Sequence, residues 1–508
     1  MTRVPVVTSR ALAHRRLAAA RDPAAPRARK YLAARPDRLA GGFSPFGVMA
    51  SARVQVRQDL RGLVAHARYG ARNLDYLRAF EMMVRRNVVG PRGIRLQVRV
   101  RTPAGEVDGE AARRIESAWS EWGERGTCTT CGRLSWWNLE RIAATMIARE
   151  GNFLGRLHIG RAFGPFAFQV EVLPLDVLDL DLVQTLPGGG YIDGGVEFDA
   201  NGRPAALHIW THHPGEHHTG RPTRRLRLPM AEVIHVYDPT EPLQALGVPA
   251  SHTALRRLNM IGRYEEAALT AAHYGAAAMA WIKRAPDAEG PPDAEAESAL
   301  LPEEIEAGMV AELPPGADLA GWTPNYPDGE MSGFVAHMLR GGAAGLGVSY
   351  SGLANDLTGA NFSSLRAGLG EEREQWRDAQ RVLYEGLHDR VFRAWIGPAI
   401  LSGRLRLPAS GLDRFAASAT WRPRGWAAVN PKDDAAAADA DLRNRLRAPS
   451  AIVAERGEDF GDVAERFAMD LETLRAAGVP LPEALTPKAA VAPPSPKSGD
   501  LEDPEAKE

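Results

Sequence analysis

The sequence predicts an α+β fold built from more than one packed region, and three observations support this. The chain has 508 residues, which is more than a single hydrophobic core normally serves. Residues 51–245 mix helical and strand-like hydrophobic spacing, whereas the chain beyond residue 251 is mainly helical in pattern. Hydrophobic residues make up 44% and charged residues 25% of the chain, as in an ordinary globular protein.

Charge is unevenly distributed along the chain although the formal net charge is only −1. Residues 1–101 contain 22 Lys or Arg against 5 Asp or Glu, so this region should meet an acidic partner. Residues 285–330 contain 12 acidic residues and no Lys or Arg, and residues 433–508 contain 17 acidic against 9 basic residues. Composition alone also allows the plainer interpretation of a disordered basic arm and a solvated acidic loop.

The first half of the chain alternates helices and strands. Residues 1–50 have no sustained period and predict an arm. Apolar spacing predicts helices between Gln58 and Val88, over Gly109 to Trp122, and over Leu139 to Glu150. Alternation after the Gly-Pro break predicts a half-buried strand within Asn87 to Val100.

Short strands follow, in FLGRLHIG, FAFQVEVL, GVEFDANGRPAALHIW and EVIHVYDP. The DANG sequence, Asp199 to Gly202, predicts a hairpin turn inside the third of them.

The second half of the chain contains long helices around an acidic insert. Ser251 to Lys283 lacks proline and is rich in Ala, which predicts one helix of roughly 50 Å. Residues 285–328 are rich in Pro, Gly, Asp and Glu, and helical spacing returns at Met331 to Leu339.

Residues 345–369, GLGVSYSGLANDLTGANFSSLRAGL, combine a loop-like first half with the start of a long patterned helix. Ser363 and Ser364 predict its N-cap, and Gly397-Pro398 predicts its end. A last acidic helical region covers 433–478 with a break near Ala448 to Ser450, and the tail beyond Pro480 has the composition of a disordered segment.

Several catalytic motifs are missing from the sequence. It contains no Gly-Lys pair, so a phosphate-binding GxxxxGK[ST] loop is excluded, and HExxH is absent. GVSYS, Gly347 to Ser351, lacks the last glycine of a GxSxG nucleophile elbow. We therefore predict no enzyme activity and no cofactor.

Two clusters could bind metal but fit poorly. Cys128 and Cys131 lack the second pair that a structural zinc site needs, so we expect two reduced thiols. The sequence HIWTHHPGEHH contains five histidines, but a Pro-Gly turn gives no fixed tetrahedral geometry, so we expect a solvated loop and no metal. No run of about 18 apolar residues predicts a membrane helix, and the Arg-rich N-terminus has no apolar stretch of a signal peptide. We expect a cytosolic location, without export.

Six segments, taken in order, resemble the lambda-type phage portal protein family, from roughly Gln58 to Val479. They are RNVVGPRGIRLQ, GVEFDANGRPAALHI, MAEVIHVYDP, ELPPG, NYPDGEMSGFVAHMLRGGAAGLGVSYSGLANDLTGANFSSLRAGL and WRPRGWAAVNPKDDAAAA. Cys131 stands where an acidic residue is common in the family, and the histidine run is denser than usual.

The resemblance implies a usually dodecameric ring at one capsid vertex of a virion assembled in the host bacterial cytoplasm. Double-stranded DNA would be driven through its channel without sequence preference by a separate large terminase and later ejected. A head-tail adaptor would dock on the same ring, which would also contact major capsid and scaffold proteins.

The family plan divides the chain into a wing, a two-helix stem with a clip insertion, a tunnel loop and a helical crown. The predicted segments are 1–50 basic N-terminal arm, 51–250 α/β wing, 251–283 stem helix, 284–328 clip, 329–345 second stem helix, 346–362 tunnel loop, 363–432 long wing helix and wing completion, 433–480 crown, and 481–508 disordered acidic tail.

In that plan the tunnel loop would contact DNA through small polar residues, although packing between subunits alone remains open. The expected loop residues are Gly347, Ser349, Tyr350, Ser351, Asn355, Asp356, Thr358 and Asn361. Acidic clip residues would dock the partners, and those selected are Glu303, Glu304, Glu306 and Glu312. The competing interpretations are a head-to-tail adaptor ring, usually a smaller protein, and a nucleic-acid-processing enzyme, which would need convergent carboxylates.

Overall fold

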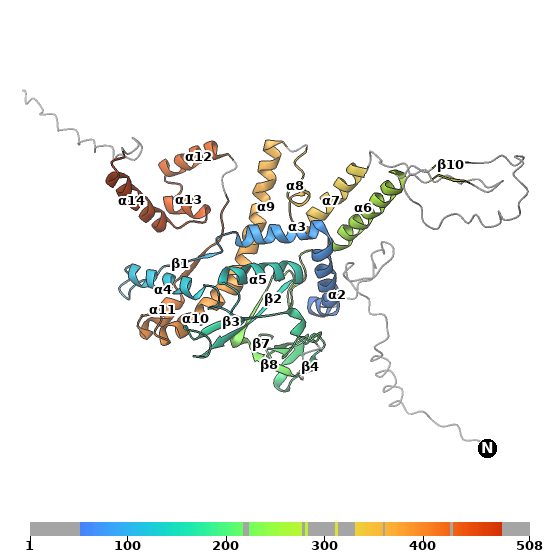
Figure 1. Ribbon diagram of the computed structural model, residues 1–508. Helices are drawn as coiled ribbons and strands as arrows, with labels where there is room; N and C mark the ends of the chain where they lie inside the picture. The colour runs from blue at the N-terminus through green and yellow to red at the C-terminus, as the bar shows by residue number, and fades with distance from the viewer. Residues whose placement is uncertain are drawn as a thin grey trace, which may run out of the picture. The chain divides into compact units, whose positions relative to one another are not determined.

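The computed structural model describes residues 51–216, 223–276, 280–282, 310–312, 331–358, 361–426 and 430–479 (Figure 1). The chain divides into two compact units, Met1–Arg424 and Gly425–Glu508. Helices and small sheets combine in the first unit, which confirms the α+β class. No helix in these described ranges is long and apolar enough to span a membrane.

Helices α2 (Ala52–Asn73), α3 (Asp75–Val84), α4 (Gly109–Trp122) and α5 (Trp136–Glu150) open the first unit. Asp108 caps α4 by accepting a hydrogen bond from the Ala111 amide, and the predicted bounds of this helix are confirmed. The helical stretch predicted between Gln58 and Val88 is interrupted at Leu74 and ends in a π-helix, η2 (Arg85–Val89).

Three antiparallel sheets follow from the predicted strands. The three-stranded sheet has the order β3-β2-β9, formed by β3 (Phe168–Leu173), β2 (Asn152–Ile159) and β9 (Val233–Tyr237). The five-stranded sheet runs β4 (Val183–Thr185), β5 (Tyr191–Asp193), β6 (Val196–Phe198), β7 (Pro204–Trp210) and β8 (Arg225–Pro229). β1 (Arg95–Val98) pairs with β12 (Ala419–Arg422). Short 3-10 turns are η3 (Leu175–Val177), η4 (Pro187–Gly189) and η6 (Met230–Glu232).

The predicted DANG turn is confirmed between β6 and β7. The Asp199 carboxylate accepts hydrogen bonds from the amides of Asn201 and Arg203, at 2.8 and 2.9 Å. Gly202 has a φ of 78°, which favours glycine.

The core of the first unit has two parts. Apolar side chains of α2, among them Val56, Leu60 and Val64, pack with the inner face of the five-stranded sheet. The other part is aromatic: Trp119 lies 4.8 Å from Trp122 and 5.1 Å from Trp395, centroid to centroid. Because α4 and α10 (Asp389–Leu401) both contribute to this cluster, it joins segments far apart in the sequence.

The long helices of the second half are α6 (Leu255–Ala276), α7 (Met331–Leu346) and α9 (Phe362–Leu383), with the short α8 (Tyr350–Ala354) between the last two. α6 and α7 lie side by side (Figure 1). The expected helix over 251–283 is wrong at both ends: residues 251–254 form a turn, and Ala280–Ile282 is a strand, β10, parallel to β11 (Val310–Glu312). Strand pairing has overridden the helix propensity of this Ala-rich sequence.

α9 continues through a π-helix, η8 (Tyr384–His388), into α10 (Asp389–Leu401). Gly397-Pro398 does not end the helix: although proline removes one backbone hydrogen bond, α10 runs on until Leu401. The predicted Ser363 and Ser364 cap is also misplaced, since α9 begins at Phe362 and the Leu365 amide bonds to the Asn361 carbonyl. η9 (Ala409–Gly411) and α11 (Leu412–Ala416) precede β12.

The second unit consists of α12 (Pro431–Arg443), α13 (Pro449–Glu455) and α14 (Phe460–Ala476), with the predicted break between α12 and α13. Asn430 and Asp459 cap α12 and α14. The predicted arm 1–50, nearly all of the predicted clip 284–328, and the tail 481–508 lie outside the described residues.

Candidate functional site

The segment between α7 and α9 is more ordered than its composition predicts. Residues Tyr350–Ala354 form helix α8, so the expectation of a continuous loop over 346–362 is wrong for this stretch. The Ser349 hydroxyl caps α8 by accepting a hydrogen bond from the Gly352 amide at 3.2 Å. Gly347 before the helix and Asn355 after it have φ values of 68° and 52°, so left-handed residues mark the two ends.

A polar network closes the far end of α8. The Tyr350 hydroxyl donates to one oxygen of Asp356 at 2.7 Å, and the Thr358 amide donates to the other at 2.9 Å. Hydrogen bonds from Thr358 and Tyr350 lower the pKa of Asp356 to about 2. The hydrogen bond to Asp356 raises the pKa of Tyr350. The Arg340 guanidinium lies over the Tyr350 ring, 4.9 Å from its centroid.

The near end of the segment is attached to α9. The Ser349 amide donates to Glu372 at 3.3 Å, and the Trp376 indole donates to the other oxygen of that carboxylate at 3.1 Å. A Cβ on Gly347 would lie 2.6 Å from the Gln375 side-chain oxygen, so glycine permits this close approach. The segment is therefore tied to one face of a rigid helix.

The structure brings together only part of the predicted site. Tyr350, Asp356 and Thr358 contact one another, whereas Ser349 acts as a cap. Asn355, Thr358 and Asn361 are exposed, and Ser351 is half-buried without a role in this network. Glu372 and Arg340, which complete the site, were not predicted, because they come from the flanking helices and no local motif marks them.

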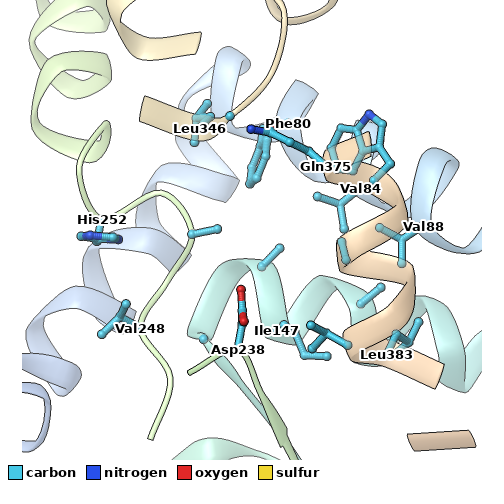
Figure 2. Close-up of a pocket in the computed structure, with 18 of the residues that line it drawn as sticks. Phe80, Val84, Val88, Ile147, Asp238, Val248, His252, Leu346, Gln375 and Leu383 are labelled. Atoms are coloured by element: carbon cyan, nitrogen blue, oxygen red, sulfur yellow. The ribbon is translucent and has the colours of Figure 1, made fainter. Parts of the chain in front are cut away.

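An apolar cavity of about 250 Å³ lies at the base of this segment. Figure 2 shows Phe80, Val84, Ile147, Leu346 and Leu383 among its lining residues. Helices α3, α5, α7 and α9 all contribute, together with the chain just before α6. Asp238 is the acidic group in the lining, and burial, with the charge of Asp378, raises its pKa. No local sequence pattern marks this cavity, since its walls come from distant segments.

The possible metal-binding residues do not converge in the described part of the chain. No three His, Cys, Asp or Glu side chains there are placed to hold a metal ion. His208 lies on β7 and contacts Glu197 at 2.8 Å, so it does not belong to a solvated loop as expected. His212 and His213 are described, and His217 and His218 lie outside the described residues.

The remaining predicted positions are placed as follows. Cys128 is buried, which raises its pKa to about 12, and Cys131 is exposed; both are free thiols. Of the acidic residues expected in the clip, Glu312 lies in β11, while Glu303, Glu304 and Glu306 lie outside the described residues.

Comparison with known proteins gives a consistent family. A model of the lambda family of phage portal proteins matches residues 43–380. A probable portal protein of Halomonas phage phiHAP-1 is 29% identical over 460 residues, which cover 89% of this chain and 88% of the relative. The portal protein of Escherichia phage N15 and portal protein B of Escherichia phage lambda are each 22% identical, covering 72% and 74% of this chain and 75% and 77% of theirs.

A solved chain from the virion of a native gene transfer agent particle has 15% sequence identity and a TM-score of 0.36. The match covers 83% of this chain and 94% of that chain.

Proposed function

Because the chain belongs to the lambda family of phage portal proteins, we propose that its copies form a ring through which double-stranded DNA is packaged and ejected. The observation that carries this proposal is the family match, which spans helices α2 to α8 and most of α9. In the family plan the ring is dodecameric, occupies the capsid vertex of the virion, and contacts capsid and scaffold proteins. The chain itself would have no ATPase activity and would depend on a terminase for it.

We assign the tunnel loop to residues 346–362. Residues 346–358 contain no Lys or Arg, so they offer no cation to hold a phosphate group tightly. Their small polar groups and the Asp356 carboxylate suit transient contact with a sliding duplex of any sequence. Since Ser349 is hydrogen-bonded to α9 and Gly347 packs closely against it, a shift of that helix would move the loop with it.

The acidic insert 284–328 is proposed as the docking site for terminase and, later, the head-tail adaptor. Its strong negative field would attract a basic partner surface and would weaken as salt rises. Reversing the charges of Glu303, Glu304 and Glu306 together should lower the affinity for both partners and flatten its salt dependence. Unchanged affinity and salt slope for both would place docking elsewhere.

The decisive experiment replaces residues 349–361 with a Gly-Ser segment of equal length. The loop buries little apolar surface, so the ring should persist in electron micrographs while the DNA packaged per particle falls. A matched control replaces the exposed turn from Thr102 to Glu106 in the same way and should package normally. Normal packaging by the loop variant would assign the loop a passive role, and loss of rings in both variants would reject the design.

Three measurements on the purified protein test the wider proposal. Purified protein should appear as a closed ring by electron microscopy and by native mass spectrometry. A monomer at every salt concentration, or turnover of ATP by the pure protein, would contradict the proposed function.

A further inference from the structure

The cavity at the base of the segment between α7 and α9 has apolar walls. Its volume is about 250 Å³, whereas an apolar cavity of about 150 Å³ is enough to hold benzene. The walls come from helices α3, α5, α7 and α9 of the first unit. Their apolar side chains include those of Phe80, Val84, Val88, Ile147 and Leu383. The cavity therefore has room for an apolar ligand of about ten non-hydrogen atoms.

One carboxylate is directed into this cavity. Asp238 directly follows strand β9, and Figure 2 shows its carboxylate pointing into the open space below Phe80. Asp238 is exposed to solvent, so a ligand in the cavity can reach it. In pockets with apolar walls, a small number of polar groups fixes the orientation of the ligand and sets the specificity.

The charge of Asp238 is not balanced by any group in the described part of the chain. Burial against the apolar walls and the charge of Asp378, on α9, both raise the pKa of Asp238, and no cation or hydrogen bond of the described residues lowers it. Glu372, on the same helix, differs in this respect, since its carboxylate accepts hydrogen bonds from the Ser349 amide and the Trp376 indole. A cation placed beside Asp238 would offset both the burial and the repulsion.

The groups around the cavity disfavour several other classes of ligand. An anion would be repelled by Asp238 and Asp378. A divalent metal ion needs several oxygen ligands, and no three acidic, His or Cys side chains of the described ranges are placed to hold one. A neutral apolar ligand would remove water from Asp238 without replacing its hydrogen bonds, which is unfavourable. An ammonium group on an apolar body avoids these penalties, and the aromatic rings of Phe80 and Trp376 in the lining attract cations.

We propose that this cavity binds a primary alkylamine, with its alkyl chain between the apolar walls and its ammonium group beside Asp238. A hydrogen bond between two charged groups is roughly twice as strong as one between neutral groups, so Asp238 would set the preference for amines. The ammonium group could belong to a free amine or to a lysine side chain of a second copy of the chain. The site does not depend on the proposed ring.

The test uses the full-length protein and three probes with the same alkyl chain, n-hexylammonium, 1-hexanol and hexanoate. Saturation-transfer NMR titrations measure the affinity for each. Hexylammonium should bind most tightly, because it alone can pair with Asp238. Hexanoate should bind least, because its charge is repelled.

Two variants separate the charge from the cavity. D238N keeps the shape of the side chain and removes its charge, so the affinity for hexylammonium should fall by about 10- to 100-fold while that for 1-hexanol should not fall. A379L places a larger side chain at a half-buried position of the lining, so the affinity for both probes should fall. The matched control is D181N, which removes an exposed carboxylate that is ion-paired with Arg61, and both affinities should stay unchanged. Thermal unfolding without ligand checks the fold of each variant.

The source of the ammonium group is decided by repeating the hexylammonium titration on dilute and on assembled protein. Equal binding in both states would indicate a free amine as the ligand. Loss of binding on assembly, reversed by dilution, would indicate a side chain of a second copy in the cavity.

Three results would overturn the inference. If 1-hexanol or hexanoate bound the unmodified protein as tightly as hexylammonium, the cavity would have no preference for amines. If D238N kept its affinity for hexylammonium, or D181N lost as much, Asp238 would not be the selecting group. If A379L bound hexylammonium as well as the unmodified protein, the amine would bind elsewhere.

Discussion

The two units of the chain differ in how their helices are stabilised. In the first unit, α4 and α10 bury Trp122, Trp395 and Phe392 completely in a shared aromatic cluster. In the second unit, no side chain of α12, α13 or α14 is buried, and Phe467 remains 49% exposed. Both units have capped helices, so local signals are present in each. Among the residues that the structure describes, a hydrophobic core is present only in the first unit.

This difference indicates what the second unit depends on. Isolated helices of this length are marginal in water, and most helical stability comes from packing of an apolar face. Phe460, Phe467 and Met469 on α14 are large and exposed. In the proposed ring, neighbouring copies would supply the missing cover. The first unit should then fold as a monomer, and the second should gain its stability on assembly.

The sharpest test of the comparison removes one aromatic side chain from each unit. Trp122→Ala empties a fully buried site and removes the indole bond to the Phe168 carbonyl, so unfolding of the first unit should become easier by about 4 kcal/mol. Phe467→Ala should change the stability of the monomer by less than about 0.5 kcal/mol. Denaturant unfolding of both variants measures this.

The same Phe467→Ala variant should weaken the ring, which a dilution series in light scattering would show. A large destabilisation of the monomer by Phe467→Ala would mean that the second unit already has a core of its own. If the ring dissociated at the same concentration in the variant, neighbouring copies would not be what covers Phe467.

The next largest effect concerns a buried polar pair in the first unit. Glu140 on α5 accepts a hydrogen bond from the Ile94 amide at 3.1 Å and lies 2.7 Å from Nε2 of His388. Glu140→Ala would leave both buried groups without this acceptor and should destabilise the unit by about 3 kcal/mol. Glu110→Ala, which breaks an exposed ion pair with Arg114, is the control and should change stability by about 0.5 kcal/mol or less. Equal losses would show that the pair at Glu140 has no special role.

Much of the fold could be predicted from the sequence because its signals are local. Helix Gly109–Trp122 has a capping aspartate and an apolar stripe within one segment, and the DANG turn is set by four residues. The helix predicted for the Ala-rich segment was wrong at its C-terminal end, where β10 pairs with β11. That pairing depends on a strand thirty residues away in sequence. Strands β4, β5 and β8 were not predicted, since short edge segments such as Val183–Thr185 have little apolar alternation.

The candidate site was predicted less well than the fold. Composition marked residues 346–362 as unlike the helices on either side, yet it could not reveal α8. That helix depends on the Ser349 cap and on a hydrogen bond to Glu372 of α9. The cavity beside it arises from packing between distant segments. No single-sequence pattern encodes such contacts.

A smaller effect is expected at the cap of α14. The Asp459 carboxylate accepts from the amides of Gly461 and Asp462 at 2.7 and 3.2 Å. Asp459→Ala should destabilise the helix by about 1 kcal/mol. Because no side chain of α12, α13 or α14 is buried, this loss should appear as reduced helicity by circular dichroism in the monomer. Asp108→Ala removes the equivalent cap on α4, and there the aromatic cluster should keep the helix formed. Equal loss of helicity in both variants would contradict the comparison.

The smallest effect is expected in α8. This helix is intermediate between the helices of the aromatic cluster and those of the second unit, because it buries one side chain, Leu353, and is otherwise held by polar contacts. The hydrogen bonds from Thr358 and Tyr350 lower the pKa of Asp356 to about 2, so its charged form is favoured in the folded loop. Its contribution is therefore complete above the ordinary pKa near 4 and is lost as the pH falls through about 2. Protection of the Thr358 amide from hydrogen exchange, relative to the same amide in an unfolded chain, should consequently stay high at neutral pH and fall only in strong acid. Asp356→Asn should give faster exchange there at neutral pH, while exchange in α4 stays unchanged. Equal exchange rates in the variant and the unmodified protein would mean that Leu353 and the Ser349 cap suffice to hold the loop.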